Sequence, residues 1–323
     1  MRYLIIDNSN LFIRNYVVNP TLNKDGYPSG GIVGTLKSIQ KIVRLTKPDK
    51  IIIVYDGAGG SQKRRTINKQ YKQGRKPLRL NRQFQLNENE ERQNNIQQMT
   101  RLGEYYDLMP IYQVIIEGVE ADDVIAFLCQ THFMELHQKI VYSSDKDFIQ
   151  LLHSDKTLLY RPIKDEILNT KRIVEQYKIH PTNFALARSI AGDKGDNIEG
   201  VSGIGLSTVA NRFSFLSKNK SYTIPELVDF AQEKVNEGSK LKAYENLVRE
   251  QQKIVENYKI TQLYSPSISI QSKQMIQNMM ENKELIFNKT KLLSMMAYDG
   301  LGEWNWDELY YSFNRILLNE RSS

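Results

Sequence analysis

Three short runs of β-branched apolar residues, each followed by an aspartate, constrain the fold of this chain most strongly. They lie at 2–7 (RYLIID), 50–56 (KIIIVYD) and, less regularly, 139–145 (KIVYSSD). Short runs with so few polar positions are typical of strands buried on both faces of a parallel sheet. Residues 31–46, between the first two runs, carry apolar side chains at helical spacing. The alternation of strand and helix predicts an α/β fold with a parallel sheet.

Asp7, Asp56 and Asp145 stand at the carboxyl ends of the predicted strands. An open parallel sheet places its ligand site just beyond these ends, so we expect the three carboxylates to share one crevice. Further acidic residues follow in groups two or three positions apart, which puts them on one face of a helix or turn. The nine candidate carboxylates are Asp7, Asp56, Glu120, Asp122, Asp123, Asp145, Asp147, Asp193 and Asp196.

Carboxylates gathered in this way need cations, because each one raises the pKa of its neighbours and all are penalised by burial. The ligands are all oxygen atoms, which favours Mg²⁺ or Mn²⁺ over zinc. Two such ions can activate a water and stabilise the leaving oxygen of a phosphodiester. Any one of these aspartates alone is typical of a turn or a helix cap. The joint pattern favours a metal-dependent phosphodiesterase.

The charge of the chain points to a polyanionic partner. Its net charge is +7, and residues 62–82 hold nine Lys or Arg and no acidic residue. If the nine carboxylates converge, the remainder of the protein carries about +16, a balance typical of nucleic-acid binding. A single cysteine excludes an internal disulfide, and no apolar run is long enough to span a bilayer. We therefore expect a cytoplasmic protein that does not enter a membrane.

The acidic motifs, in their order, resemble those of the 5′-nuclease or flap endonuclease family. This family includes phage 5′–3′ exonucleases of the ribonuclease H type and the 5′-nuclease domain of bacterial DNA polymerase I. The motifs are LIIDNSNLF at 4–12, VYDG at 54–57, GVEADDVIA at 118–126, SSDKDFIQL at 143–151 and GDKGDNIEGVSGIG at 192–205. The resemblance covers roughly residues 1–215.

The resemblance implies a domain organisation. We expect a PIN-like parallel-sheet nuclease domain over 1–185, with a helical arch inserted at about 62–110. A helix-turn-helix-like module that binds duplex DNA would follow over 186–264, and a helical tail would occupy 265–323.

The resemblance also implies roles for individual residues. Asp7, Asp56, Glu120 and Asp122 would form one metal group, and Asp123, Asp145, Asp147, Asp193 and Asp196 a second, with Asp122 able to bridge the two. The candidate catalytic cations are Arg64, Lys72, Arg75 and Arg188, and Tyr71 would contact DNA. A Lys or Arg at the foot of the arch can donate to the scissile phosphate. The alternative for these basic residues is a solvated cationic loop.

The glycine turn at 200–207 (GVSGIGLS) is the second candidate DNA contact. Gly203 and Gly205 carry no side chain, so backbone amides can approach a phosphate closely. The resemblance adds a K⁺ ion at this turn and a duplex partner read without base contacts. A plain helix connection with glycine caps is the alternative.

The function expected from the resemblance is a 5′–3′ exonuclease and flap endonuclease that removes RNA primers during lagging-strand replication. Its substrates would be branched or 5′-ended duplex DNA and RNA–DNA hybrid. We expect a monomer, phage-encoded and acting in the host bacterial cytoplasm. Aromatic tail residues could dock a single-strand-binding protein or sliding clamp, or pack in the core; these are Trp304, Trp306, Tyr310, Tyr311 and Phe313. A non-catalytic DNA-structure-binding protein and a PIN-type ribonuclease remain as alternatives.

Overall fold

The structure of the chain, a computed structural model, describes residues 1–74, 84, 86–301, 305 and 307–321. Within these residues the main sheet has six strands in the order β3-β2-β1-β4-β5-β6. The strands are β1 (Arg2–Asp7), β2 (Lys50–Tyr55), β3 (Tyr112–Ile115), β4 (Gln138–Tyr142), β5 (Thr157–Arg161) and β6 (Glu166–Leu168). The first five are parallel and β6 is antiparallel to β5. The predicted parallel sheet is therefore confirmed.

The strand order reverses direction between β1 and β4, which makes this the switch point of the sheet. Ile5 of β1 pairs with Ile52 of β2 on one side and with Val141 of β4 on the other. Chain connections leave β1 and β4 in opposite directions, so a crevice opens beyond their carboxyl ends. The sequence places Asp7 and Asp145 at the two sides of this crevice.

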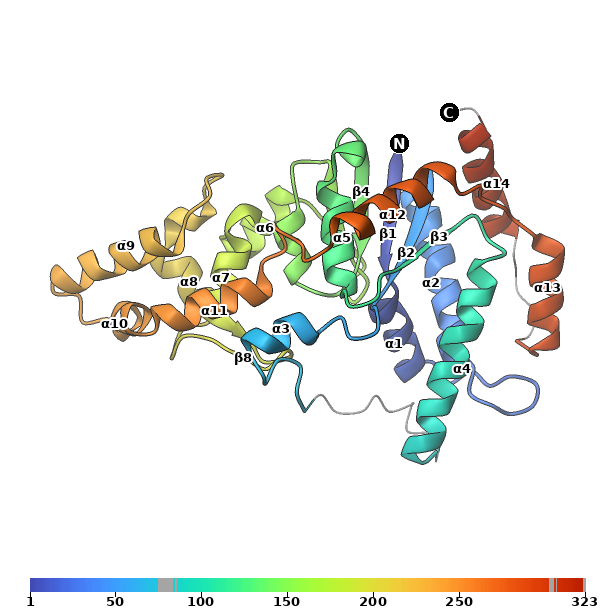
Figure 1. Cartoon of the computed structure of the whole chain (residues 1–323), viewed down its shortest axis with the longest axis horizontal. Coiled ribbons are helices and arrows are strands. Elements are labelled where there is room, and N and C mark those ends of the chain that lie inside the picture. The colour runs from blue at the N-terminus through green and yellow to red at the C-terminus, as the bar shows by residue number, and fades with distance from the viewer. Residues whose placement is uncertain (75–83, 85, 302–304, 306, 322–323) are drawn as a thin grey trace.

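Helices cover both faces of the sheet (Figure 1). In that view α5 and α12 lie on one side of the strands, and α1, α2 and α4 lie on the other. The helices that belong to the sheet domain are α1 (Asn8–Val18), α2 (Gly30–Thr46), α3 (Gln62–Ile67), α4 (Glu88–Tyr106), α5 (Ala121–Gln130) and α6 (Thr170–Tyr177). Short 3₁₀ segments lie at η1 (His132–Met134), η2 (Asp147–Leu151), η3 (Pro181–Asn183) and η4 (Ser214–Ser217).

Helices α1 and α2 approach closely because α2 begins with glycines. A Cβ at Gly34 would lie 2.6 Å from Oδ1 of Asn15, and one at Gly31 would lie 2.6 Å from the ring of Phe12. This contact fixes α1 in the wall of the crevice. The helix predicted at 31–46 is confirmed as α2, whereas α1, β3, β5 and β6 had no counterpart in the sequence analysis.

The second half of the chain is helical. Its helices are α7 (Phe184–Ala191), α8 (Leu206–Arg212), α9 (Ile224–Asn236), α10 (Lys242–Arg249), α11 (Gln251–Thr261), α12 (Ile270–Asn282), α13 (Lys289–Tyr298) and α14 (Asp307–Arg321). A small hairpin of β7 (Gly192–Asp193) and β8 (Ile198–Glu199) follows α7. Helices α9 and α10 form the far end of the molecule in Figure 1. The proposed domain boundaries at 185 and 264 stay predictions.

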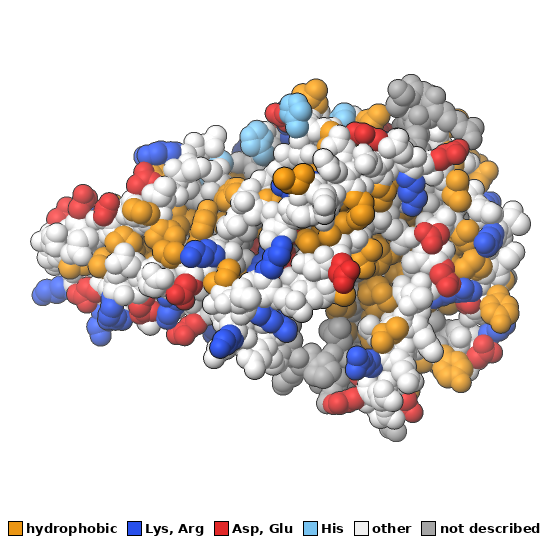
Figure 2. Space-filling view, in the orientation of Figure 1, with side chains coloured by type: hydrophobic (Ala, Val, Ile, Leu, Met, Phe, Trp, Pro, Cys, Tyr) orange, Lys and Arg blue, Asp and Glu red, His pale blue; other side chains and the backbone are white. Residues whose placement is uncertain are grey.

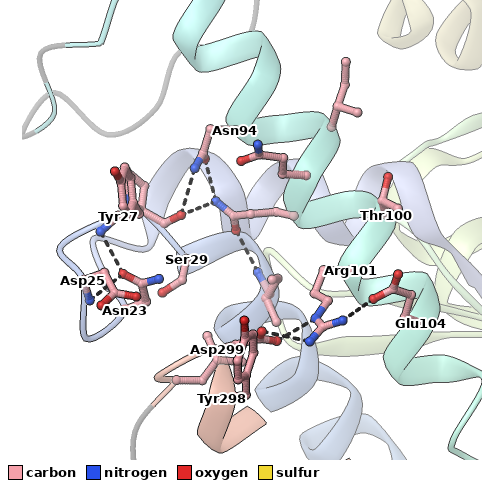
Figure 3. A pocket seen from close by; sticks show the side chains of 16 residues that line it. Asn23, Asp25, Tyr27, Ser29, Asn94, Thr100, Arg101, Glu104, Tyr298 and Asp299 are labelled. Carbon is pink, nitrogen blue, oxygen red and sulfur yellow. Dashed lines mark hydrogen bonds and ion pairs between the residues drawn. The ribbon is translucent and has the colours of Figure 1, made fainter. Parts of the chain in front are cut away.

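The C-terminal helices return to the sheet domain and pack against it. Arg101 of α4 donates from Nε to Asp299 at 2.7 Å and from Nη2 at 2.9 Å, a two-pronged ion pair. Figure 3 shows this pair between α4 and the end of α13. Helix α14 packs on α2, and Phe313 of α14 is fully buried. Trp304 and Trp306 lie outside the described residues.

In the described part of the chain, no helix is both long and apolar enough to cross a membrane.

Candidate active site

A cavity of about 470 Å³ opens at the switch point of the sheet. Its lining comes from α1, from the ends of β1, β2 and β4, from the start of α5 and from the turn after α3. The lining residues are Asp7, Ser9, Asn10, Ile13, Arg14, Val17, Val18, Asp56, Lys72, Asp122, Ser144, Asp145 and Ile163. Four of the nine predicted carboxylates therefore share one crevice with one predicted lysine.

Asp7 ends β1 and caps α1. Its Oδ1 accepts from the backbone N–H of Asn10 at 3.0 Å, and its Oδ2 accepts from the hydroxyl of Ser143 at 3.0 Å. Burial raises the pKa of Asp7 to about 6, and the nearby Asp56 adds to the rise. Asp7 therefore has two roles: it caps α1, as its sequence context allowed, and it lines the cavity.

Asp56 follows β2 and is held by α5 and α1. Its Oδ1 accepts from the N–H of Ala121 at 3.0 Å and its Oδ2 from the hydroxyl of Ser9 at 2.8 Å. Gly57 makes this approach possible, because a Cβ there would lie 1.7 Å from the carbonyl oxygen of Ile116. The VYDG motif therefore joins β2 directly to the start of α5.

Asp122 and Asp145 both line the cavity, and the charge of Asp145 acts on Asp122. Burial and the charge of Asp145 raise the pKa of Asp122 well above its ordinary value. Burial and the charge of Asp147 raise the pKa of Asp145 to about 7. Both carboxylates therefore resist ionisation, and a divalent cation bound beside them would stabilise their ionised forms.

Glu120 precedes α5 and collects three donors. It accepts from Nη1 of Arg64, from the hydroxyl of Tyr71 at 3.3 Å and from Nζ of Lys72 at 2.5 Å. Burial alone would raise the pKa of Glu120, but Arg64 and Lys72 outweigh it and lower the pKa. Glu120 is therefore neutralised by cations of the chain itself.

Lys72 connects this cluster to the second half of the chain. Its backbone is left-handed, with φ 54°, and its N–H donates to the carbonyl of Asp196 at 2.9 Å. The side-chain amide of Asn197 donates to the carbonyl of Gln70 at 3.1 Å. A lysine rarely takes this backbone conformation, so these bonds hold the turn that aims its side chain at the cavity.

Arg188 holds two further acidic residues. Its Nε donates to Oδ1 of Asp147 at 2.9 Å, its Nη2 pairs with Asp193, and its Nη1 donates to the carbonyl of Gly192. Burial raises the pKa of Asp147, although Arg188 counteracts the rise. Asp196 acts electrostatically on both Asp145 and Asp147. Arg188 thus joins η2 to the β7 hairpin instead of lining the cavity.

The remaining predicted residues lie elsewhere. Asp123 is 5% exposed and pairs with Arg64 behind the cavity. Tyr71 is 2% exposed, so it offers no surface to DNA in this structure. Gly203 has φ 75° with nothing near its Cβ position, and Gly205 caps α8 in extended backbone. Arg75 lies outside the described residues.

The structure groups the acidic residues differently from the division that the resemblance implied. Asp145 lines the same cavity as Asp7, Asp56 and Asp122. Glu120 and Asp123 gather around Arg64, and Asp147 and Asp193 gather around Arg188.

Several cavity residues escaped the sequence analysis. Ser9, Asn10 and Arg14 line the cavity from α1, and Ser143 donates to Asp7. Asn10 and Arg14 are four positions apart on one helical face. A helix predicted directly after Asp7 would have identified them.

A second cavity, of about 520 Å³, has none of the nine candidate carboxylates in its lining (Figure 3). It is enclosed by the 23–32 segment, α4 and the end of α13. Arg101 in its wall is fully engaged by Asp299 and Glu104. The two cavities share no lining residue.

The donor set of the acidic cavity suits a hard divalent cation. All candidate ligands are carboxylate oxygens, and burial, together with the charges of neighbouring carboxylates, raises the pKa of three of the four cavity aspartates. Among the described residues, however, no three acidic, His or Cys side chains are arranged so that they could hold a metal ion. Lys72, Arg64 and Arg188 form ion pairs with carboxylates that could otherwise bind a metal ion.

Carboxylates at the switch point of a parallel sheet, with a lysine from an inserted segment among them, define a PIN-like α/β nuclease. Residues 2–178 match the family described as 5′-3′ exonuclease, N-terminal resolvase-like domain. The chain therefore belongs to the 5′-3′ exonuclease family and is a 5′-nuclease. This confirms the fold class, the family and the enzyme class expected from the motifs.

Two curated relatives agree with this assignment, and a solved structure shares the fold. A 5′-3′ exonuclease of Aquifex aeolicus is 28% identical over 212 residues, 64% of this chain and 67% of that protein. A 5′-3′ exonuclease of Buchnera aphidicola is 32% identical over 215 residues, with the same shares of the two chains. A bacteriophage T5 flap endonuclease, solved with DNA and metal ions, has a TM-score of 0.68 at 18% identity and covers 87% of this chain and 100% of that one.

Proposed function

We propose that the chain is a divalent-metal-dependent 5′–3′ exonuclease and structure-specific flap endonuclease. The observation that carries the proposal is the cavity in which Asp7, Asp56, Asp122 and Asp145 lie with Lys72. Four carboxylates beside one lysine suit a phosphodiester bound through cations, because the phosphate brings negative charge into an already acidic site.

The cavity aspartates would hold the first ion, Mg²⁺ or Mn²⁺, and Asp147, Asp193 and Asp196 would hold a further one. The bound ions would supply an activated water and offset the charge of the leaving oxygen. Lys72 would leave Glu120 and donate to the scissile phosphate, where it stabilises charge that develops during cleavage. Glu120, once Lys72 has left it, would join the first ion, and Arg188 would keep Asp147 in place.

Substrate selection would involve the two halves of the chain together. The turn carrying Lys72 is bonded to the loop of Asp196, so the inserted segment and the helical module meet at the cavity. The open turn at Gly203 and Gly205 would receive a duplex phosphate, with K⁺ as its expected ion. Lys and Arg side chains lie over α3, α10 and α11 in Figure 2, interspersed with acidic ones.

The proposed substrates are 5′-ended or branched duplex DNA and RNA–DNA hybrid, in keeping with RNA-primer removal. The proposed setting is the cytoplasm, that of a bacterial host if the gene is phage-borne, with the protein acting as a monomer. A single-strand-binding protein or sliding clamp is the proposed partner of the tail, where Tyr311 is 73% exposed.

The test is cleavage of a 5′-labelled flap duplex with Mg²⁺, beside an RNA–DNA hybrid and single-stranded RNA. We expect cuts near the 5′ end of the flap and the hybrid, and little cleavage of single-stranded RNA. Binding of the flap without cleavage would support a DNA-structure-binding protein. Preference for single-stranded RNA would support a PIN-type ribonuclease.

A further inference from the structure

We propose that Asp123 is a positioning residue of the site and not one of its metal ligands. The inference rests on the proposed function, because it concerns which acidic residues of that site hold the ions. It departs from the sequence-based expectation, which placed Asp123 in the second metal group with Asp145 and Asp147.

Both oxygens of Asp123 are engaged by the chain. Oδ1 accepts from the backbone N–H of Ser267 at 2.8 Å, and Oδ2 pairs with Nη1 of Arg64 at 3.0 Å. The side chain lines a small cavity of about 90 Å³ together with Lys63 and Lys259, and it is absent from the lining of the acidic cavity. A ligand role would require Asp123 to break both contacts at a site where its side chain is 7% exposed.

Asp123 and Glu120 share a single guanidinium. Nη1 of Arg64 reaches both carboxylates, and Nε of Arg64 donates to the carbonyl of Ile260 at 3.0 Å. Asp123 and Glu120 thus share the positive charge of Arg64. Through its two contacts, Asp123 also connects α3, α5 and the 263–269 segment. Without that negative charge, Glu120 alone would face the buried guanidinium and would be held more firmly away from a metal ion.

The experiment is Mn²⁺ titration followed by electron paramagnetic resonance, on the wild-type chain, Asp123→Asn and Asp122→Asn. Asparagine at 123 keeps an oxygen for the Ser267 amide and loses the charge. We expect Asp123→Asn to bind as many Mn²⁺ ions as the wild type, with the half-saturating concentration raised about 10-fold. Asp122→Asn, the matched change in the cavity, should lose at least one ion.

The effect of removing Arg64 distinguishes a positioning role of Asp123 from a purely structural one. In the double variant Asp123→Asn/Arg64→Gln, the guanidinium that immobilises Glu120 is gone, so the Mn²⁺ affinity should return to within about 3-fold of the wild type. An ion lost in Asp123→Asn and still missing in the double variant would overturn the proposal. So would an affinity loss that Arg64→Gln does not relieve.

A measurement on the wild-type chain covers the case in which Asp123→Asn does not fold. Hydrogen exchange of the Ser267 amide is compared without Mg²⁺ and at saturating Mg²⁺. A positioning role predicts unchanged protection, because Asp123 keeps its bond to that N–H. Faster exchange on Mg²⁺ addition would mean that Asp123 had moved to the metal, and the proposal would fail. Failure of the proposed function is a separate result, namely no Mn²⁺ binding by the wild type.

Discussion

Nζ of Lys72 donates to Oε1 of Glu120 at 2.5 Å, so the lysine that lines the acidic cavity is held by a carboxylate at the start of α5. Tyr71 and Arg64 contact the other oxygen of the same carboxylate. Lys72, the proposed phosphate donor, is therefore held in an ion pair with Glu120. Its release depends on another positive charge that pairs with Glu120 in its place.

Replacement of Lys72 by alanine should slow cleavage of the flap duplex by roughly 10²-fold or more at saturating Mg²⁺, because one donor to the phosphate is lost. Mn²⁺ binding should persist, since no carboxylate is removed. Single-turnover kinetics check the rate. Lys69→Ala is the matched control, because Lys69 is exposed in the same segment and does not line the cavity. Equal rates for both variants would reject the role of Lys72.

Asp122→Asn should nearly abolish turnover while the duplex still binds. The change removes a negative charge from the middle of the cavity but preserves the shape of the side chain. Cleavage and binding are measured on the same labelled duplex, by gel and by anisotropy. Asp155→Asn is the control, since Asp155 is exposed and lies outside the cavity lining. Activity of Asp122→Asn close to that of the wild type would exclude Asp122 from the site.

The metal-free protein should lose stability as the pH rises through the neutral range. Burial and the charge of Asp147 raise the pKa of Asp145 from 3.8 to about 7, so the folded state prefers the protonated form. Ionisation of Asp145 therefore costs the folded state up to about 4 kcal/mol by pH 8. Asp145→Asn should be more stable than the wild type, with a difference that widens from about pH 4 to pH 7 and is then constant.

Urea denaturation of both proteins at a series of pH values checks this prediction. Subtracting one curve from the other removes the contributions of the titratable groups that the two proteins share. Saturating Mg²⁺ should reverse the order of stability, because the cation binds the ionised form of the wild type. A difference that does not change with pH would show that Asp145 has an ordinary pKa.

Asp299→Asn should weaken the attachment of the C-terminal helices. Asp299 accepts from two nitrogens of Arg101 and from the hydroxyl of Tyr105, and its side chain is 18% exposed. Loss of these charge-assisted bonds should lower the free energy of unfolding by about 1.5–3 kcal/mol. Asp165→Asn is the control, because the Asp165–Lys41 pair is about half exposed and should leave the denaturation midpoint unchanged.

Local sequence patterns predicted the elements that build the floor of the site. Strands β1, which ends at Asp7, and β2, which ends just before Asp56, are apolar along almost their whole length. Helix α2 has a clear helical period, so all three elements appear where the patterns placed them. Helix α4 lies within the segment of about 62–110, where the resemblance placed a helical insertion. Strand β3 is only four residues long with an exposed end, which leaves too little pattern to predict a strand.

The pairing of charges within the site could not be predicted, because it depends on contacts between distant segments. Glu120 and Lys72 are 48 positions apart, and Arg188 reaches Asp147 across 41. Sequence spacing predicted that the acidic residues form one set, yet it carries no information on which of them would pair with an arginine. Asp123 is the clearest case, since its partner Ser267 lies 144 residues away in a segment without a motif.

The bond between Arg101 and Asp299 joins residues 198 positions apart. During synthesis the N-terminal strands leave the ribosome long before α13 is made. Arg101 of α4 can therefore bind Asp299 only after most of the chain has been synthesised. Bonds of this range make the last helices a late step in maturation. Until α13 has been made, a nascent chain therefore carries α4 without its contact to Asp299.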